Sequence, residues 1–282
     1  MFKRQIDGSC ICVFCDRLIS VNKPSCPHCD RKNPSLWGYS RSLRRLGSDL
    51  GFTAIVTWGC IALYLTTLLI DLGNISNTGA FDFLAPSLRS LIMFGASGAE
   101  PVFKYGHWWT LLSAGWLHGS LLHITFNLGW VHYLAPKVAK AFGSGRLVII
   151  YTVSIVMSSL LSSLFGDFFQ ELPVLQGAQV TIGASGGLFG LLGALVAYGQ
   201  ITRNSIIRHQ ALTYAVVMFL FGFFMPNVDN WGHFGGFSGG YLISRMGGLD
   251  PRYPEGLRQL FLAITCLVLT TLSILASLVL NN

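Results

Sequence analysis

Long apolar segments separated by short polar ones fill most of the chain. A helix that crosses a bilayer needs about 20 mainly apolar residues, and seven segments have roughly that length. They are Phe52–Ile70, Trp108–Ala135, Leu147–Phe165, Ala184–Ile201, Ile206–Met225, Trp231–Met246 and Gln259–Leu280. The pattern predicts an all-α polytopic membrane protein with seven spanning helices.

The remaining polar segments divide the chain into regions. We expect a Cys-rich module, a basic linker, a six-span core and a loop with one further span, at residues 1–35, 36–51, 52–246 and 247–282. The N-terminal region is polar and basic, which predicts that it is not a cleavable signal peptide. Within the long connection Asp71–His107, the segment Ser87–Phe94 is apolar enough to lie along the membrane surface.

Composition and charge agree with a membrane protein. Only 11% of the residues are charged and the mean hydropathy is +0.55, whereas a soluble domain carries about 25% charged residues. Of the Lys and Arg residues, all but Arg89 and Lys104 fall on one side of the predicted spans. By the positive-inside rule the N-terminus is cytoplasmic and the C-terminus lies outside. The net charge of +7 therefore reports topology rather than a nucleic-acid partner.

The second predicted span carries polar residues that are costly inside a membrane and are therefore functional candidates. His123 and Asn127 are four residues apart, so they share one face of a helix. His118 lies five residues before His123 and does not share that face closely. A polar clasp between helices is the alternative interpretation of the pair.

The fourth span opens with a serine among small residues, Gly183-Ala184-Ser185-Gly186. Small residues at intervals of three or four let membrane helices pack closely, and the stripe formed by Gly186, Gly190, Gly193 and Ala197 is of this kind. Taken alone, Ser185 could be one more packing residue.

The sixth span carries a second glycine stripe, formed by Gly232, Gly236 and Gly240, with His233 beside its first member. A histidine here could simply bond to a backbone carbonyl in the core. Two glycine-striped helices can approach closely, however, which would let the short side chain of Ser185 meet His233.

These pieces together predict a catalytic site near the outer membrane face. A serine hydroxyl becomes a nucleophile when a base within hydrogen-bond reach takes its proton, a role open to His233. The oxyanion that develops needs donors, which His123 and Asn127 can supply. In the predicted topology, the spans that carry Ser185 and His233 begin on the outer side of the membrane.

In these residues the chain resembles the rhomboid family of intramembrane serine proteases, over Phe52–Met246. The motifs that carry the resemblance occur in the family's order: His118, His123 and Asn127, then Gly183-Ala184-Ser185-Gly186, then Asn230-Trp231-Gly232-His233. Where the family commonly has Trp-Arg, this chain has Trp109-Thr110. The seventh span resembles that of members with six spans plus one.

The resemblance implies a Ser–His dyad without an acidic third member. Ser185 would be the nucleophile, His233 the general base and then acid, and His123 with Asn127 the oxyanion donors. It further implies a supporting set made of Gly183, Gly186, Phe189, Gly236 and Gly240, in which Phe189 stacks on the catalytic histidine. The implied fold is a six-helix bundle around a short central fourth helix. The implied substrates are membrane-spanning proteins, and the implied gate is the fifth helix with the loop Met225–Asp229.

The N-terminal cysteines predict a metal site. The spacing of Cys12, Cys15, Cys26 and Cys29 is that of a zinc ribbon, in which two Cys-x2-Cys pairs hold one Zn²⁺. A reducing cytoplasm disfavours disulfides there. A redox-active or disordered segment is the alternative, and Cys10 or His28 could replace a ligand. Cys60 and Cys266 are expected to be packing residues. We expect the module to bind a cytoplasmic protein partner or to position the protein.

Two other functions remain open at this point. The chain could be a non-catalytic membrane protein that binds or retains transmembrane clients, or a transporter with a proton path through His123, Asn127 and His233. The sequence has neither evident inverted repeats nor carboxylates within spans, which disfavours a transporter. We expect catalysis without a cofactor, no nucleic-acid partner, and a bacterial inner membrane as the location.

Overall fold

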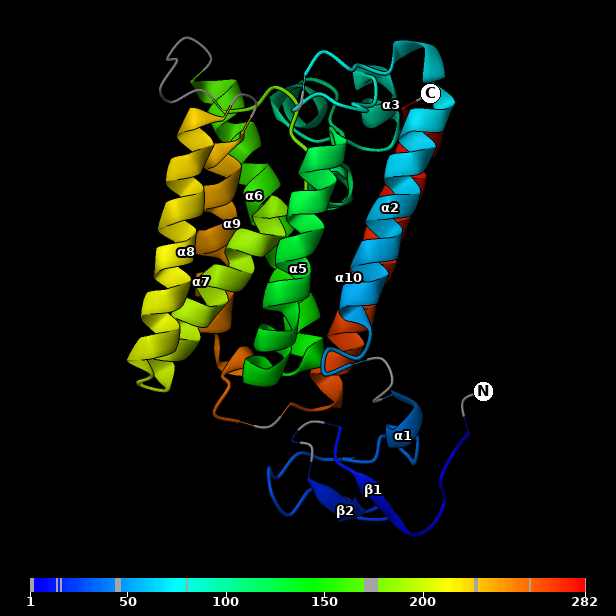
Figure 1. The fold of residues 1–282 in the computed structure, drawn as a ribbon, viewed down its shortest axis with the longest axis vertical. Coiled ribbons are helices and arrows are strands. Elements are labelled where there is room, and N and C mark those ends of the chain that lie inside the picture. Colours follow the sequence, from blue (N-terminus) through cyan, green and yellow to red (C-terminus); the bar gives the residue numbers. More distant parts are fainter. Residues whose placement is uncertain are drawn as a thin grey trace.

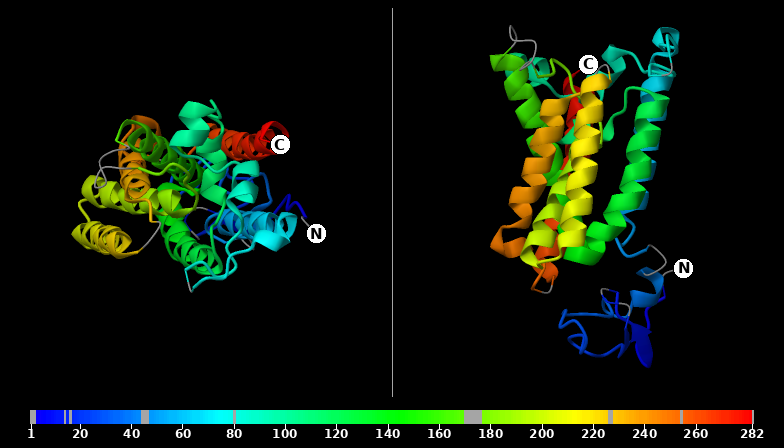
Figure 2. Two further views of the ribbon diagram at one scale, coloured as in Figure 1. Left: turned by 90° about the horizontal axis from the view of Figure 1, so that it is seen from above. Right: turned by 60° about the vertical axis from the view of Figure 1, so that its left-hand side comes forward.

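The computed structural model is a bundle of long helices with a small module beyond one end (Figures 1 and 2). It describes residues 3–13, 15, 17–43, 47–79, 81–169, 177–225, 228–253 and 255–281. The long helices are α2 (Phe52–Ile70), α5 (Leu121–Phe142), α6 (Ser144–Phe168), α7 (Ser185–Ile201), α8 (Ser205–Phe224), α9 (Asn230–Ser244) and α10 (Leu257–Leu280). In the described part of the chain, α2, α6, α8 and α10 are long and apolar enough to cross a membrane. The chain is a multi-pass integral membrane protein.

The long helices alternate in direction. Figure 1 shows α2, α6, α8 and α10 running away from the N-terminal module, while α5, α7 and α9 run back towards it. The short elements α3 (Leu88–Met93), η3 (Glu100–Lys104), α4 (Thr110–Ser113) and η4 (Ala114–Trp116) lie at the far end with the C-terminus. We call this the far end and the other the module end. Ser185 and His233 both sit on helices that descend from the far end.

The helix α7 forms the centre of the bundle. Its residues from Gly186 to Ala197 are all buried, whereas α8 exposes most of its apolar side chains. A helix of 17 residues is about 25 Å long, shorter than the hydrocarbon core of about 30 Å. The expected short central fourth helix is therefore confirmed, and its first residue, Ser185, lies below the far end of the bundle.

Glycine lets α9 pack against α7 backbone to backbone. A Cβ atom at Gly236 would overlap the carbonyl oxygen of Gly186, and one at Gly240 would overlap the carbonyl oxygen of Gly190. The two glycine stripes expected from the sequence thus face each other. Such close approach gains dispersion energy, which is the main source of helix association where lipid already surrounds apolar surfaces.

The predicted bounds of the second span were wrong at both ends. Its helix begins at Leu121 rather than Trp108 and continues to Phe142 rather than Ala135. Leu117 and Ser120 are extended, and the Ser120 side chain caps the new helix by accepting from the His123 N–H. Pro136 does not end the helix, which stops at Gly143 with a φ of 107°.

The residues before α5 are held instead by the C-terminal helix. The Trp109 indole donates to Ser277 Oγ at 3.0 Å, and Ser273 Oγ donates to the Trp109 carbonyl at 2.6 Å. Thr110 is fully buried, and its hydroxyl donates to the His107 carbonyl at 2.7 Å. The threonine that departs from the family pattern is thus packed and bonded, and α10 forms part of this packing.

A loop contact anchors the start of α6 at the module end. Glu255 precedes α10, and its Oε1 accepts from the Arg146 backbone N–H at 2.7 Å in the first turn of α6. Burial raises the pKa of the Glu255 carboxyl. The contact ties the loop before α10 to the core.

The N-terminal module contains a β-hairpin. Its strands β1 (Ser9–Ile11) and β2 (Leu18–Ser20) are antiparallel, with Cys10 opposite Ile19. The short helix α1 (Ser40–Leu43) follows before the bundle begins, and the 3₁₀ turns η2 (Leu72–Asn74) and η5 (Gly247–Leu249) lie in loops.

The glycine contact between α7 and α9 gives a stability prediction. Gly240→Ala should lower the free energy of unfolding by about 1–3 kcal/mol, because its Cβ overlaps backbone that can move only by parting the helices. Thermal unfolding in detergent micelles measures the effect. The control is Gly129→Ala in α5, where a Cβ meets no atom within 4 Å. Equal unfolding temperatures for the two variants would contradict the packing described.

Candidate active site and metal cluster

Ser185 is the first residue of α7 and is half-buried. The chain reaches it through Gly183, whose φ of 124° lies in the region that favours glycine. The Gly183 N–H donates to the Ala114 carbonyl at 2.9 Å, which fixes the entry to the helix. A side chain at position 183 would also meet the His123 ring, since its Cβ would lie 2.7 Å from His123 Nε2. This position requires glycine for both reasons.

His233 lies in the first turn of α9 and is 9% exposed. Asp229 caps this helix, with Oδ1 accepting from the Gly232 N–H at 2.8 Å. Its Oδ2 accepts from the Thr181 hydroxyl at 2.6 Å. Thr181 precedes α7 by a few residues, so one carboxylate ties the approach to Ser185 to the helix that carries His233.

The His233 ring packs against α7. It stacks on Phe189 with the ring centroids 4.2 Å apart and the planes at 17°. Phe189 is four residues after Ser185 and therefore shares its helical face. One turn farther along α9, Gly236 contacts the Gly186 backbone. The imidazole thus lies against the first turns of α7, and the expected stack is present.

His123 approaches the start of α7 from α5. Its Nδ1 accepts from the Gly119 backbone N–H at 3.3 Å. An N–H group can only donate, so Nδ1 carries no proton and the neutral ring holds its proton on Nε2. A Cβ at Gly183 would lie 2.7 Å from this Nε2 and 3.7 Å from Ser185 Oγ. His123 Nε2 and Ser185 Oγ therefore both lie beside residue 183.

Asn127 lies one turn below His123 and is almost fully buried. One hydrogen of its Nδ2 is donated to the His123 carbonyl at 3.0 Å. Its Oδ1 and the Nδ1 of His233 are both buried without a hydrogen-bond partner in the described part of the protein. Other buried atoms of the described residues share this state, among them both ring nitrogens of the neighbouring His118, and each such atom calls for a water, a ligand or a functional role.

Three contributors to the site were not recognised from the sequence. Asp229 and Thr181 tie its two segments together, and Ser158 on α6 lies where Cβ atoms at Gly186 and Gly232 would collide with its hydroxyl or come within 3.1 Å of it. An acidic residue before a helix is a typical N-cap signal, so Asp229 could have been found. Ser158 gives no such signal.

His118, which the sequence had placed off the face of His123 and Asn127, is buried beside His123, with the ring centroids 5.1 Å apart.

The expected gate loop can be described only in part. The helix α8 ends at Phe224, and within Met225–Asp229 the residues 226 and 227 lie outside the described ones.

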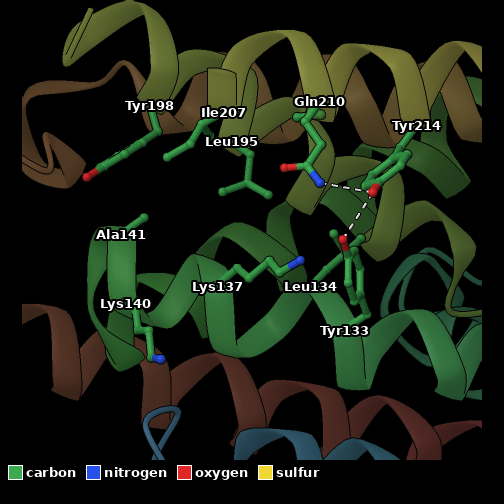
Figure 3. Close-up of a pocket in the computed structure, with 11 residues that line it drawn as sticks. Tyr133, Leu134, Lys137, Lys140, Ala141, Leu195, Tyr198, Ile207, Gln210 and Tyr214 are labelled. Atoms are coloured by element: carbon green, nitrogen blue, oxygen red, sulfur yellow. Dashed lines mark hydrogen bonds between the residues drawn. The ribbon is translucent and has the colours of Figure 1, made fainter. Parts of the chain in front are cut away.

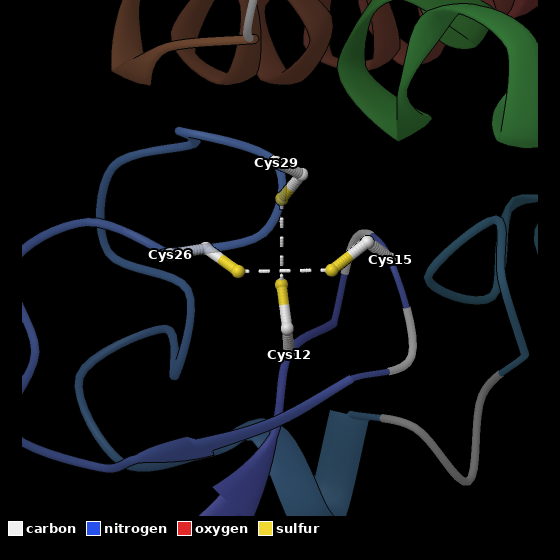
Figure 4. A group of neighbouring side chains, drawn as sticks. All are labelled: Cys12, Cys15, Cys26 and Cys29. Carbon is white, nitrogen blue, oxygen red and sulfur yellow. Dashed lines mark hydrogen bonds between the residues drawn. The ribbon is translucent and has the colours of Figure 1, made fainter.

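A second cluster lies in the N-terminal module, where the predicted four cysteines converge (Figure 4). The sulfur atoms of Cys12, Cys15, Cys26 and Cys29 all lie within 4.8 Å of one another. The Cys12–Cys29 distance is 3.9 Å and the Cys15–Cys26 distance is 3.7 Å. Four thiolates about 2.3 Å from one tetrahedral Zn²⁺ would be about 3.8 Å apart. The cluster can hold a metal ion of this kind.

The buried Cys10 and the proton on Cys29 also bear on metal binding by the cluster. Cys10 is buried nearby but is not one of the four converging residues. Burial and the Cys15 and Cys26 thiols raise the pKa of the Cys29 thiol to about 11, so metal binding must displace its proton.

Comparisons with known proteins agree with this geometry. The rhomboid domain family model matches residues 105–249, just over half of the chain. RHOMBOID-like protein 5 of Arabidopsis thaliana is 35% identical over 174 residues, which cover 60% of this chain and 53% of that protein. Rhomboid protease GluP of Bacillus subtilis is 31% identical over 175 residues, covering 61% of this chain and 32% of that protein.

A third relative is named as inactive. Inactive RHOMBOID-like protein 8 of Arabidopsis thaliana is 31% identical over 159 residues, covering 55% of this chain and 42% of that protein. The chain thus spans about half or less of the length of these relatives. With the all-α bundle and the match to the family model, the chain belongs to the rhomboid family.

Proposed function

We propose that this protein is an intramembrane serine endopeptidase that uses Ser185 and His233 as a dyad. The observation that carries the proposal is the stack of His233 on Phe189, which holds an imidazole against the helix that Ser185 begins. The name of Rhomboid protease GluP, a relative over 175 residues, also supports it.

The proposed reaction begins with attack of Ser185 Oγ on the carbonyl carbon of the scissile peptide bond. His233 takes the hydroxyl proton during the attack and later gives it to the leaving amine, which leaves an acyl-enzyme. Water then attacks the ester, again with His233 as the base, and releases the acid. Only protein groups and water take part.

His123 and Asn127 are the proposed donors to the oxyanion. The tautomer set by Gly119 puts a proton on His123 Nε2, on the side of Ser185. The second Nδ2 hydrogen of Asn127 is available, since the first is donated to the His123 carbonyl. The backbone N–H groups in the first turn of α7 have no hydrogen-bond partner within the helix and point towards its N-terminus, where Ser185 lies.

The proposed substrates are membrane proteins, cut near the far end of the bundle. Ser185 begins a short helix below that end, so a peptide must enter the membrane region to reach it. The charge distribution supports a cytoplasmic module end and an outer far end. A bacterial inner membrane is the proposed location.

The dyad predicts loss of activity in two single variants. Ser185→Ala and His233→Ala should each lower cleavage of a model transmembrane substrate by about a thousandfold or more, because nucleophile and base act as a unit. Gel-based cleavage in liposomes measures this. The controls Ser205→Ala and His132→Ala alter exposed residues of α8 and α5 and should retain activity. Cleavage at the wild-type rate by either dyad variant would rule out the assignment.

The oxyanion donors predict a different kinetic effect. His123→Ala should lower kcat by about 10²–10³-fold with little change in KM, because the lost donor acts on the transition state. Asn127→Ala should act in the same direction. Thr125→Ala is the matched control, since its exposed hydroxyl bonds only to the Leu121 carbonyl of its own helix. A change confined to KM in His123→Ala would assign that residue to substrate binding instead.

The N-terminal module is proposed to be a zinc ribbon at residues 1–35, joined by a linker at 36–51 to the core at 52–246, which the segment 247–282 completes. The spacing of the four sulfur atoms supports zinc. The proposed role of the module is to dock a cytoplasmic protein partner.

Zinc binding is tested on the full chain. Metal analysis of the purified protein should find about one zinc per chain, and Cys12→Ser should lose it because only three thiolates remain. Cys10→Ser is the control, since Cys10 is buried in the same module outside the four converging sulfur atoms. Zinc retained in Cys12→Ser, or absent from the wild type, would refute the proposal.

A second candidate function is a non-catalytic protein that binds transmembrane clients. The observation that supports this second function is that one relative is named Inactive RHOMBOID-like protein 8. This function predicts that the wild type binds a transmembrane client without cutting it, and that Ser185→Ala changes nothing. The proposed protease predicts cleavage by the wild type and binding without cleavage by Ser185→Ala.

A further inference from the structure

A pocket opens between α5 and α8 (Figure 3). Its lining residues belong to the module-end half of both helices, away from Ser185. Its volume is about 230 Å³. One wall comes from α5, the opposite wall from α8, and the back from α7. The residues nearest the dyad are absent from its lining, so the pocket is a separate feature of the molecule.

The body of the pocket is apolar. Leu134, Leu195, Ile207 and Ala211 line it, and Leu134 and Ala211 are almost fully buried. On the same helix as Ile207 and Ala211, the outward side chains Val217, Leu220 and Phe224 are more than half exposed, as expected for a surface that faces lipid. An acyl chain can pass from this surface into the pocket without crossing a polar region.

A polar bridge crosses the pocket between the two walls. The Tyr133 and Tyr214 hydroxyl groups lie 3.1 Å apart, and Gln210 Nε2 donates to the Tyr214 hydroxyl at 3.0 Å. Figure 3 shows these three side chains meeting at one side of the apolar residues. Tyrosine is typical of the interface between headgroups and acyl chains. The bridge supplies hydroxyl and amide donors at that depth.

A lysine places positive charge beside the bridge. Lys137 is exposed, and its Nζ lies 3.1 Å from the centroid of the Tyr133 ring. Figure 3 shows this amine directed towards Gln210 and Tyr133, whereas Lys140, a lining residue farther along α5, points away from them. Within the described residues, neither lysine forms an ion pair with a carboxylate. The site thus offers an uncompensated positive charge next to hydroxyl donors.

We propose that this pocket binds one anionic phospholipid. Its phosphodiester would bind Lys137 and the bridge of Tyr133, Tyr214 and Gln210, and an acyl chain would lie along the apolar body. Basic pockets between spanning helices on the cytoplasmic side recognise anionic headgroups in this way. A soluble anion uses only the charge, whereas a lipid also fills the apolar body and reaches it from the side.

The lipid would join α8 to α5 across a gap where the protein itself has the Tyr133–Tyr214 contact and the ring contact of Trp130 with Tyr214. This role does not depend on proteolysis, because none of the pocket residues belongs to the proposed catalytic machinery.

The test uses the full chain in detergent micelles and native mass spectrometry. The probes are dioleoylphosphatidylglycerol, dioleoylphosphatidylcholine with the same acyl chains, and inorganic phosphate. We expect the wild type to bind phosphatidylglycerol more tightly than phosphatidylcholine, and inorganic phosphate not to compete. Lys137→Gln should weaken phosphatidylglycerol binding about fivefold, the effect of one basic residue near an anionic headgroup, and Lys137→Arg should restore it.

The matched control is Arg258→Gln, which removes an exposed charge at the module end of α10. It should leave phosphatidylglycerol binding unchanged. Equal weakening by Lys137→Gln and Arg258→Gln would show diffuse electrostatic attraction and overturn the site. Equal affinity for the two lipids, or displacement by inorganic phosphate, would overturn the assignment to an anionic phospholipid.

Discussion

The backbone contact between α7 and α9 is the interaction on which the rest of the structure depends. At Gly193, Gly236 and Gly240 a Cβ atom would overlap backbone of the facing helix, so none fits between α7 and α9 at these positions. Because a serine side chain is short, a base on α9 can come within hydrogen-bond reach of Ser185 only when the two helices are in backbone contact. The Phe189–His233 stack and the Asp229–Thr181 hydrogen bond then fix the rotation of α9 about its axis and its depth relative to α7.

The polar groups of the site are held by the ends of helices rather than by their middles. Ser120 caps α5 and orders the turn in which the Gly119 N–H fixes the His123 tautomer. Asp229 caps α9 just before His233. Inside a membrane the backbone N–H groups at a helix start need partners within the protein, so side chains that cap a helix also orient the residues beside the cap. Asn127 Oδ1 and His233 Nδ1, two of the buried side-chain atoms that have no hydrogen-bond partner in the described part of the protein, lie within this arrangement.

The sequence predicted the parts of this fold that depend on local pattern. Apolar length located α2 at Phe52–Ile70 and α7 from its first turn, and glycine periodicity predicted which faces meet. It misplaced the start of α5, because Trp109, within the apolar run before that helix, is held by Ser273 and Ser277 of α10, more than 150 residues distant in sequence. The Asp229–Thr181 tie and the pocket between α5 and α8 also arise from tertiary placement. No periodicity along a single helix encodes them.

The central claim is that His233 activates Ser185 in a folded membrane protein. Labelling with a fluorophosphonate probe tests it most directly, because the probe reacts with an activated serine and needs no substrate. We predict a single adduct that peptide mass spectrometry maps to Ser185, and its loss in a folded His233→Ala variant. An adduct on another serine, no adduct on the folded wild type, or equal labelling of His233→Ala would contradict the account.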